Sequence, residues 1–248
     1  MPPRIQLVGS SFTRAFRNVW MLEELGLSYE VIDVAPGSRF LRSLVESGKI
    51  PILLEFDDDV NKTVTNNATS EQQPSFILYE SSAINTHLAD QYEESSRASQ
   101  RFVPEPKTRE RAIYDQTISC VMTELDAQGL WIHRKHAAMG QYFGTIPDAV
   151  DAAKLNFTKM NQQISKQLNP YLLGEKFTAA DILYVHCLDW SKSIGWHVDW
   201  PSNVQPYRDL CHTRPAYLSA KAKRDVGKEE RKQNGTKLFR KEDSTSNL

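Results

Sequence analysis

Two short apolar runs near the start of the chain are separated by one helical stretch, and this spacing restricts the fold more than any other feature. Residues 5–8 are IQLV and residues 29–34 are YEVIDV, both typical of β-strands. Between them, apolar residues recur at helical spacing until Gly26. Because a helix normally joins parallel strands through a right-handed crossover, residues 4–34 are predicted to form a βαβ unit.

The next segments extend this unit into a small domain of residues 1–92. A helix is predicted around residues 39–46, strands over 52–56 and 76–79, and a helix over 81–92. No helical segment lies between the last two strands, so we expect them to be antiparallel. Residues 57–75 contain almost no apolar side chains, which predicts a mobile insertion that the domain tolerates on its surface.

The second half of the chain has helical patterns throughout. Residues 93–107 are polar with two prolines, and they are interpreted as a linker before a helical domain of residues 108–220. Helices are predicted over 109–125, 147–168 and 178–193, and Thr178 and Asp181 have the spacing of a helix cap. From Lys221 onward, nine Lys/Arg stand against five Asp/Glu, so residues 221–248 are predicted to be a charged, solvated and disordered tail.

Composition excludes several classes of function. The chain has 30 Lys+Arg against 31 Asp+Glu, so its net charge is close to zero and we do not expect a dedicated nucleic-acid binder. No apolar run approaches the ~18 residues of a membrane span, and the first residues do not resemble a signal peptide, so we expect a cytoplasmic protein without membrane contact. Cys120, Cys187 and Cys211 form no Cys-x-x-Cys pair. His133 and His136 have no further ligand at fixed spacing, so no metal site is expected.

Four segments then carry a resemblance to a known family. They are residues 9–26 (GSSFTRAFRNVWMLEELG), 48–53 (GKIPIL), 78–84 (LYESSAI) and 173–182 (LGEKFTAADI). Together, in this order, they resemble cytosolic glutathione S-transferases, particularly the serine-type classes, over about residues 4–220. The resemblance implies an α/β plus all-α protein: a thioredoxin-like βαβ-α-ββ-α N-terminal domain, an all-helical C-terminal domain and a homodimer.

The family's Ser-x-x-x-Arg spacing, counted back from Arg17, places Thr13 at the position of the hydroxyl that stabilises the glutathione thiolate. Threonine keeps the donor, although its methyl group restricts the side chain. Three interpretations stay open: thiolate stabilisation by Thr13, capping of the following helix by Thr13 alone, and a catalytic role for Ser10 or Ser11 instead. Arg17 either adds positive potential or lies on a solvated helix face.

The same resemblance places the glutathione-binding residues in two segments. Lys49 would lie near a glutathione carboxylate, or it is only a solvated lysine at the start of a strand. The backbone beside the Ile50–Pro51 bond would pair with the peptide, if that bond is cis as in thioredoxin-like folds. Glu80 and Ser81 end a strand and open a helix. A helix start with a hydroxyl suits a carboxylate, and an adjacent acid suits an ammonium, which are the two charges of a γ-glutamyl group. The alternatives are that the Ser81 hydroxyl only caps the helix and that Glu80 is an exposed acid near the first turn.

The sequence therefore predicts a glutathione transferase that uses glutathione as co-substrate, attacks a small apolar electrophile and serves detoxification. Trp131, Tyr142, Phe143 and Trp196 could line the electrophile pocket or belong to the core. One alternative is a non-catalytic glutathione-binding or interaction protein of the same fold. Another is a glutathione-dependent dehalogenase, isomerase or peroxidase.

Overall fold

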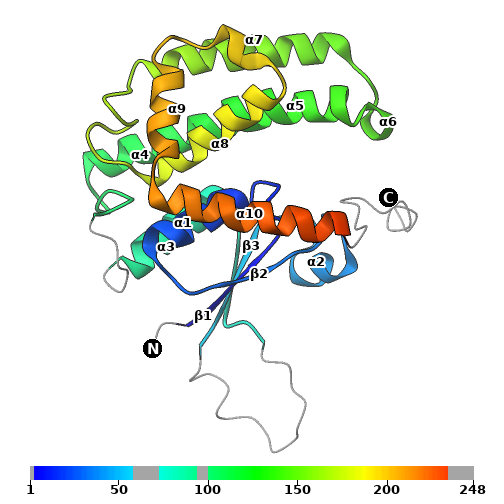
Figure 1. The fold of residues 1–248 in the computed structure, drawn as a ribbon, viewed down its shortest axis with the longest axis vertical. Helices are drawn as coiled ribbons and strands as arrows, with labels where there is room; N and C mark the ends of the chain where they lie inside the picture. The colour runs from blue at the N-terminus through cyan, green and yellow to red at the C-terminus, as the bar shows by residue number, and fades with distance from the viewer. Residues whose placement is uncertain (1–2, 58–72, 94–99, 234–248) are drawn as a thin grey trace, which may run out of the picture. The chain divides into compact units, whose positions relative to one another are not determined.

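The chain folds into two compact units, which Figure 1 traces from residue 1 to residue 248. The computed structural model describes residues 3–57, 73–93 and 100–233. The first unit combines residues 1–99 with residues 215–248, and the second consists of residues 100–214. Residues 58–72 of the expected insertion, 94–99 of the expected linker and 234–248 of the expected tail lie outside the described part.

The first unit is built on a four-stranded mixed sheet with the order β2-β1-β3-β4. Its strands are β1 (Arg4–Val8), β2 (Glu30–Ile32), β3 (Ile52–Phe56) and β4 (Phe76–Tyr79). β1 pairs with β2 in parallel, whereas β1–β3 and β3–β4 are antiparallel. Both the predicted βαβ unit and the predicted antiparallel pair are confirmed, and the N-terminal domain is thioredoxin-like.

Helices α1 (Phe16–Leu25) and α2 (Arg39–Leu44) connect β1 to β2 and β2 to β3, and α3 (Ser81–Tyr92) follows β4. Gly26 ends α1 with φ 63°, a left-handed conformation that glycine adopts without steric cost. Alternation along β3 sends Ile52 and Leu54 to the face where they pack with Leu41 of α2. It sends Glu55 to the other face, where the carboxylate lies 2.9 Å from Nε2 of His87 on α3. Helices therefore cover both faces of the sheet.

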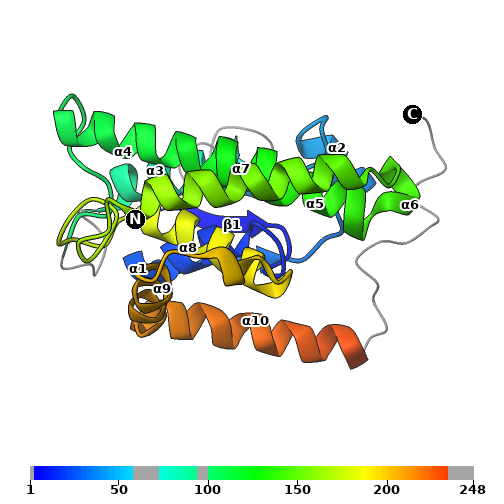
Figure 2. The same ribbon diagram turned by 90° about the horizontal axis from the view of Figure 1, so that it is seen from above.

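The C-terminal helix α10 (Pro215–Gln233) belongs to this first unit, which contradicts the prediction of a disordered tail from residue 221. It lies alongside α1, as Figure 2 shows. Tyr217 is buried, with its ring 4.8 Å from that of Trp20, and the Arg224 guanidinium lies 4.3 Å from the ring of Phe16. The prediction failed because it counted charges, whereas long cationic side chains can cover aromatic rings.

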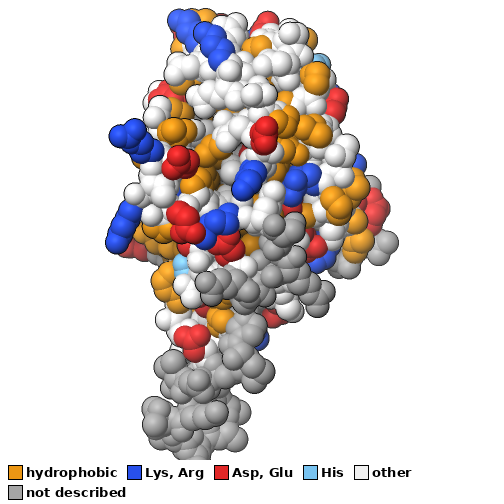
Figure 3. All heavy atoms as spheres, turned by 90° about the vertical axis from the view of Figure 1, so that its left-hand side faces the viewer, with side chains coloured by type: hydrophobic (Ala, Val, Ile, Leu, Met, Phe, Trp, Pro, Cys, Tyr) orange, Lys and Arg blue, Asp and Glu red, His pale blue; other side chains and the backbone are white. Residues whose placement is uncertain are grey.

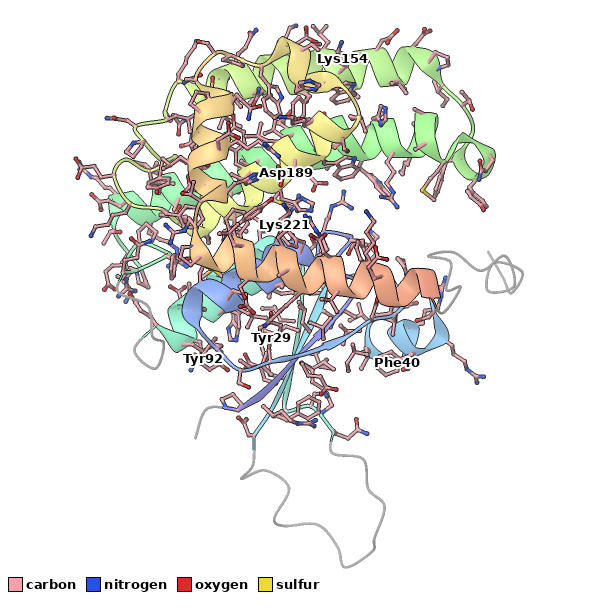
Figure 4. The ribbon with its side chains drawn as sticks, in the orientation of Figure 1. Tyr29, Phe40, Tyr92, Lys154, Asp189 and Lys221 are labelled. Atoms are coloured by element: carbon pink, nitrogen blue, oxygen red, sulfur yellow. The ribbon has the colours of Figure 1, made fainter. Side chains whose placement is uncertain are left out.

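A polar cluster fixes the same helix pair. The Glu23 carboxylate on α1 accepts hydrogen bonds from Tyr29 (2.5 Å), Ser219 (2.6 Å) and the Lys223 ammonium. Burial acts to raise the pKa of Glu23, but these hydrogen bonds outweigh it and hold the pKa below its ordinary value. Tyr29 also lies under the Lys223 ammonium, 4.6 Å from the centre of its ring, and is labelled in Figure 4. The cations of α10 therefore have specific partners on the first unit.

The second unit is helical throughout its described residues. Its elements are α4 (Arg109–Cys120), the π-helical η1 (Val121–Leu130), α5 (Trp131–His133), the π-helical η2 (Arg134–Ala138), α6 (Gly140–Phe143), α7 (Pro147–Ser165), α8 (Ala179–Ser193), the 3₁₀ turn η3 (Trp196–Asp199) and α9 (Val204–His212). The helix expected to end near residue 125 continues through η1 to Ala138. The unit also begins earlier than expected, because Phe102 and Val103 of the predicted linker are buried in it.

The buried helix of this unit is α8, and its start confirms the predicted cap. The Thr178 backbone N–H donates to the Asp181 carboxylate at 2.8 Å, which forms part of a complete capping box. Phe177 and Ile182, on either side of the cap, are both buried as a hydrophobic staple requires.

No helix within the described residues is long and apolar enough to cross a membrane. On the face drawn in Figure 3, cationic and anionic side chains are interspersed.

We predict that Tyr217→Ala lowers the free energy of unfolding by about 3 kcal/mol, because it removes a buried ring from between α10 and α1. Leu218→Ala is the matched control: the neighbouring side chain is 52% exposed, so its loss should change stability by less than about 0.5 kcal/mol. Urea denaturation measures both variants. Equal stability of the two would mean that α10 does not contribute to the fold as described.

Candidate functional site

The register of the sheet brings three loops together at one end of the first unit. Val8 is paired with Ile52, and Ile52 is paired in turn with Tyr79. Because β3 runs opposite to both neighbours, the residues after β1, before β3 and after β4 share one end of the sheet. Gly9–Ser10, Ile50–Pro51 and Glu80–Ser81 are those residues. The structure therefore places the sequence-predicted segments side by side.

Gly9 joins the first two of these loops by close backbone approach. It has φ +142°, and its backbone N–H donates to the Ile32 carbonyl at 2.9 Å. A Cβ atom built on it would lie 3.2 Å from both the Ala15 and Ile50 Cβ atoms. The Ile50–Pro51 peptide bond is cis. The first loop thus lies directly against the cis-proline segment, and a side chain at position 9 would meet a tight contact at an unfavourable φ.

The three candidate hydroxyls differ in what they already bind. Ser10 is buried, and its Oγ accepts from the Phe12 backbone N–H at 3.3 Å, whereas Ser11 is half-buried. Thr13 Oγ1 donates to the Ser10 carbonyl at 2.6 Å and accepts from the Ala15 N–H at 3.3 Å. Thr13 does not cap α1, because that helix begins at Phe16 with Ala15 at the cap position and no side-chain hydrogen bond there. Its hydroxyl closes the turn before the helix instead.

The second segment presents a cation at its surface. Lys49 is exposed, Ile50 is half-buried and Pro51 is buried against the sheet. The Lys49 backbone N–H donates to the Ser47 hydroxyl at 3.4 Å. The ammonium can therefore meet a ligand carboxylate, while the backbone beside Pro51 is held by the buried ring.

The third segment is the start of α3, where Glu80 has φ 75°, an uncommon conformation for a residue with a side chain. Such strain is found most often at functional sites. Glu80 is exposed, and its carboxylate has no partner among the described residues. Ser81, the next residue, is only 1% exposed. An accessible acid and a hydroxyl beside unpaired helix N–H groups thus lie within two residues of each other.

Sequence reasoning did not foresee the contacts behind Ser81. Arg17 is fully buried, and its Nη1 donates to Ser81 Oγ at 3.1 Å. Asn18 Nδ2 donates both to the Ser81 carbonyl at 2.9 Å and to Asn85 Oδ1 at 2.7 Å. The available signal was the adjacent pair Arg17–Asn18 inside the apolar stretch FRNVWML, where two polar residues interrupt a buried helix face.

The second unit carries the aromatic residues considered for an electrophile pocket. Trp196 is 6% exposed, with its ring 5.4 Å from Phe157, so it belongs to the core of that unit. Tyr142 and Phe143 are exposed, and Trp131 is half-buried. A hollow of about 440 Å³ lies elsewhere in this unit, lined by Gln162, Ser165, Lys166, Asp199, Trp200, Pro201 and Asn203.

Comparison with known proteins agrees with this geometry. Residues 6–96 match the family described as glutathione S-transferase, N-terminal domain. This match identifies residues 6–96 as a glutathione S-transferase N-terminal domain. No curated protein sequence gave a significant match.

Solved structures with the same fold cover most of the chain. A glutathione S-transferase from Actinobacillus pleuropneumoniae is 26% identical, with a TM-score of 0.65 over 89% of this chain and 93% of that one. A family member from Pseudomonas fluorescens with two glutathione bound is 19% identical, with a TM-score of 0.68 over 88% and 92%. Ure2p5 from Phanerochaete chrysosporium, cocrystallized with 1-(S-glutathionyl)-2,4-dinitrobenzene, is 16% identical, with a TM-score of 0.71 over 92% and 97%.

We predict that Gly9→Ala destabilises the first unit by about 1 to 3 kcal/mol, because the new methyl group meets both Ala15 and Ile50 at an unfavourable φ. Gly37→Ala is the comparison for a positive φ in open space: Gly37 has φ +79°, and nothing lies within 4 Å of an added Cβ. Chemical denaturation should show a clearly larger loss for Gly9→Ala. A similar loss in both variants would contradict an extra cost of close packing at Gly9.

Proposed function

We propose that the chain is a glutathione transferase that binds glutathione at the loop end of its sheet and conjugates the thiolate to small apolar electrophiles. The observation that carries the proposal is the meeting of Ser10–Thr13, Ile50–Pro51 and Glu80–Ser81 at one end of the sheet. The match of residues 6–96 to the glutathione S-transferase N-terminal domain supports the same ligand, as do structural neighbours that contain glutathione or a glutathione conjugate. A homodimer and a detoxifying role belong to this proposal through the family resemblance.

Each charged part of glutathione has a suitable group among these loops. The γ-glutamyl carboxylate is assigned to Ser81 and the N–H groups at the start of α3, and its ammonium to Glu80. The peptide backbone is assigned to the backbone beside Pro51, and the glycyl carboxylate to Lys49. This orientation directs the cysteine of glutathione toward the loop after β1.

Reaction requires that the thiol lose its proton near neutral pH. A free cysteine thiol has a pKa near ~8.5, and lowering it by about two units means favouring the thiolate by roughly 2.7 kcal/mol. A hydroxyl donor from Thr13, Ser10 or Ser11, with backbone N–H groups of the loop, can supply this. The thiolate would then form a C–S bond to the electrophile as the leaving group departs with its electron pair.

One observation favours a second candidate, a glutathione-binding protein without conjugating activity. The Thr13 hydroxyl proton is directed at the Ser10 carbonyl, 2.6 Å away. To donate to a thiolate, Thr13 would have to exchange that bond. An assay of binding and turnover on the same preparation separates the candidates, because tight glutathione binding without conjugation of an aromatic halide would favour the second.

We predict that Glu80→Gln weakens glutathione binding about 10-fold or more, because a charge-assisted contact to the γ-glutamyl ammonium is worth about 1.5 to 3 kcal/mol. Calorimetric titration measures the change. Glutaryl-cysteinyl-glycine, which lacks that ammonium, is the control ligand, and its affinity should be equal for the variant and the unaltered chain. An unchanged glutathione affinity would remove the ammonium from Glu80.

We predict that Thr13→Ala raises the pKa of the bound glutathione thiol by about 1 to 2 units and slows conjugation at pH 7 about 10- to 100-fold, because the thiolate loses one donor. Thiolate absorbance of the complex against pH measures the shift. Thr13→Ser should keep both pKa and rate, since it keeps the hydroxyl. An unshifted titration in Thr13→Ala with a shifted one in Ser10→Ala or Ser11→Ala would transfer the role to that serine.

A further inference from the structure

A fully buried arginine stands directly behind the hydroxyl assigned to the γ-glutamyl carboxylate. Arg17 is the second residue of α1, where the helix dipole disfavours a cation, and its side chain is 0% exposed. Burial of a charge costs free energy unless the charge is hydrogen-bonded. A buried arginine at this position therefore indicates a role that a leucine or methionine could not perform.

The direction of the Arg17–Ser81 hydrogen bond is fixed by chemistry. A guanidinium group has only donors, so Nη1 of Arg17 must donate and Ser81 Oγ must accept across their 3.1 Å contact. A serine hydroxyl has a single hydrogen, which then points away from Arg17. Among the described residues, no acceptor receives a hydrogen bond from Ser81 Oγ. The hydroxyl is thus oriented as a donor and its proton is uncommitted.

The neighbouring residue on α1 holds the backbone of the same serine. Asn18 Nδ2 donates to the Ser81 carbonyl at 2.9 Å, and Asn18, Asn85 and Ser81 are all buried. Consecutive residues of α1 therefore fix the side chain and the main chain of Ser81 in one orientation. Since buried charges are weakly screened, the cation also strengthens the hydroxyl as a donor toward an anion.

We propose that Arg17 is a positioning residue for glutathione: it orients and polarises the Ser81 hydroxyl so that this hydroxyl donates to the γ-glutamyl carboxylate. The inference rests on the proposed function, because it assumes that this carboxylate binds at the start of α3. Arg17 acts through Ser81 and needs no contact of its own with the ligand. Its removal should therefore affect ligands that carry this carboxylate and spare ligands that lack it.

The test compares two ligands by calorimetric titration: glutathione and 4-aminobutyryl-cysteinyl-glycine, which lacks only the γ-glutamyl carboxylate. Arg17→Met, which keeps the apolar packing volume, should weaken glutathione binding about 10-fold and leave the analogue unchanged. In a Ser81→Ala background the same substitution should have no further effect on glutathione. Arg4→Met is the control for net charge, since Arg4 lies at the opposite end of β1 from the site, and it should alter neither affinity.

Arg17→Lys is a second variant for the case that Arg17→Met does not fold, because it keeps a buried cation and one donor. It should bind glutathione more tightly than Arg17→Met, with the same analogue affinity. Equal loss of both ligands in the folded Arg17 variants, or an additive effect with Ser81→Ala, would overturn the positioning role while the proposed function stands. Failure of the unaltered chain to bind glutathione would overturn the proposed function and this inference with it.

Discussion

The pairing of β3 with both β1 and β4 is the constraint on which the candidate site depends. Once Ile52 lies between Val8 and Tyr79, the direction of each strand decides which loops meet at that end. A slip of one residue would send Leu53 and Glu55 to the opposite face and separate the loops. β3 is buried along its whole length, so its register is held by packing on both faces. The chemistry of the loops is positioned by the sheet rather than by contacts among themselves.

The helix pair α1–α3 adds a second level of control. Its interface is partly polar: Arg17 and Asn18 on one helix meet Ser81 and Asn85 on the other. Polar contacts between buried helices specify one relative orientation more strictly than apolar side chains, which can repack at low cost. The start of α3 is therefore fixed to the first turn of α1, and the turn containing Thr13 immediately precedes that helix. The candidate groups on separate loops thus share one rigid support.

Local patterns in the sequence predicted the strands, the Gly26 helix end and the Thr178–Asp181 cap, because each depends on residues close together in the chain. The segments of the candidate site were also predictable, through their order and a family resemblance. Features set by tertiary contact were missed. The burial of Arg17 depends on Ser81, far along the chain, and the helical state of residues 221–233 depends on the rings and carboxylate of α1. A count of charges near Lys223 does not show that the Glu23 carboxylate on α1 accepts a hydrogen bond from its ammonium.

The first unit takes its last helix from residues 215–233, after the entire second unit in chain order. A ribosome makes the chain from its N-terminus, and domains generally begin to fold during synthesis. The sheet and α1–α3 can assemble early, but the faces of Phe16 and Trp20 that contact Tyr217 have no cover until α10 emerges. Completion of the first unit is thereby delayed until residues 215–233 have been made. Synthesis of residues 100–214 therefore separates in time the two parts of one packed unit.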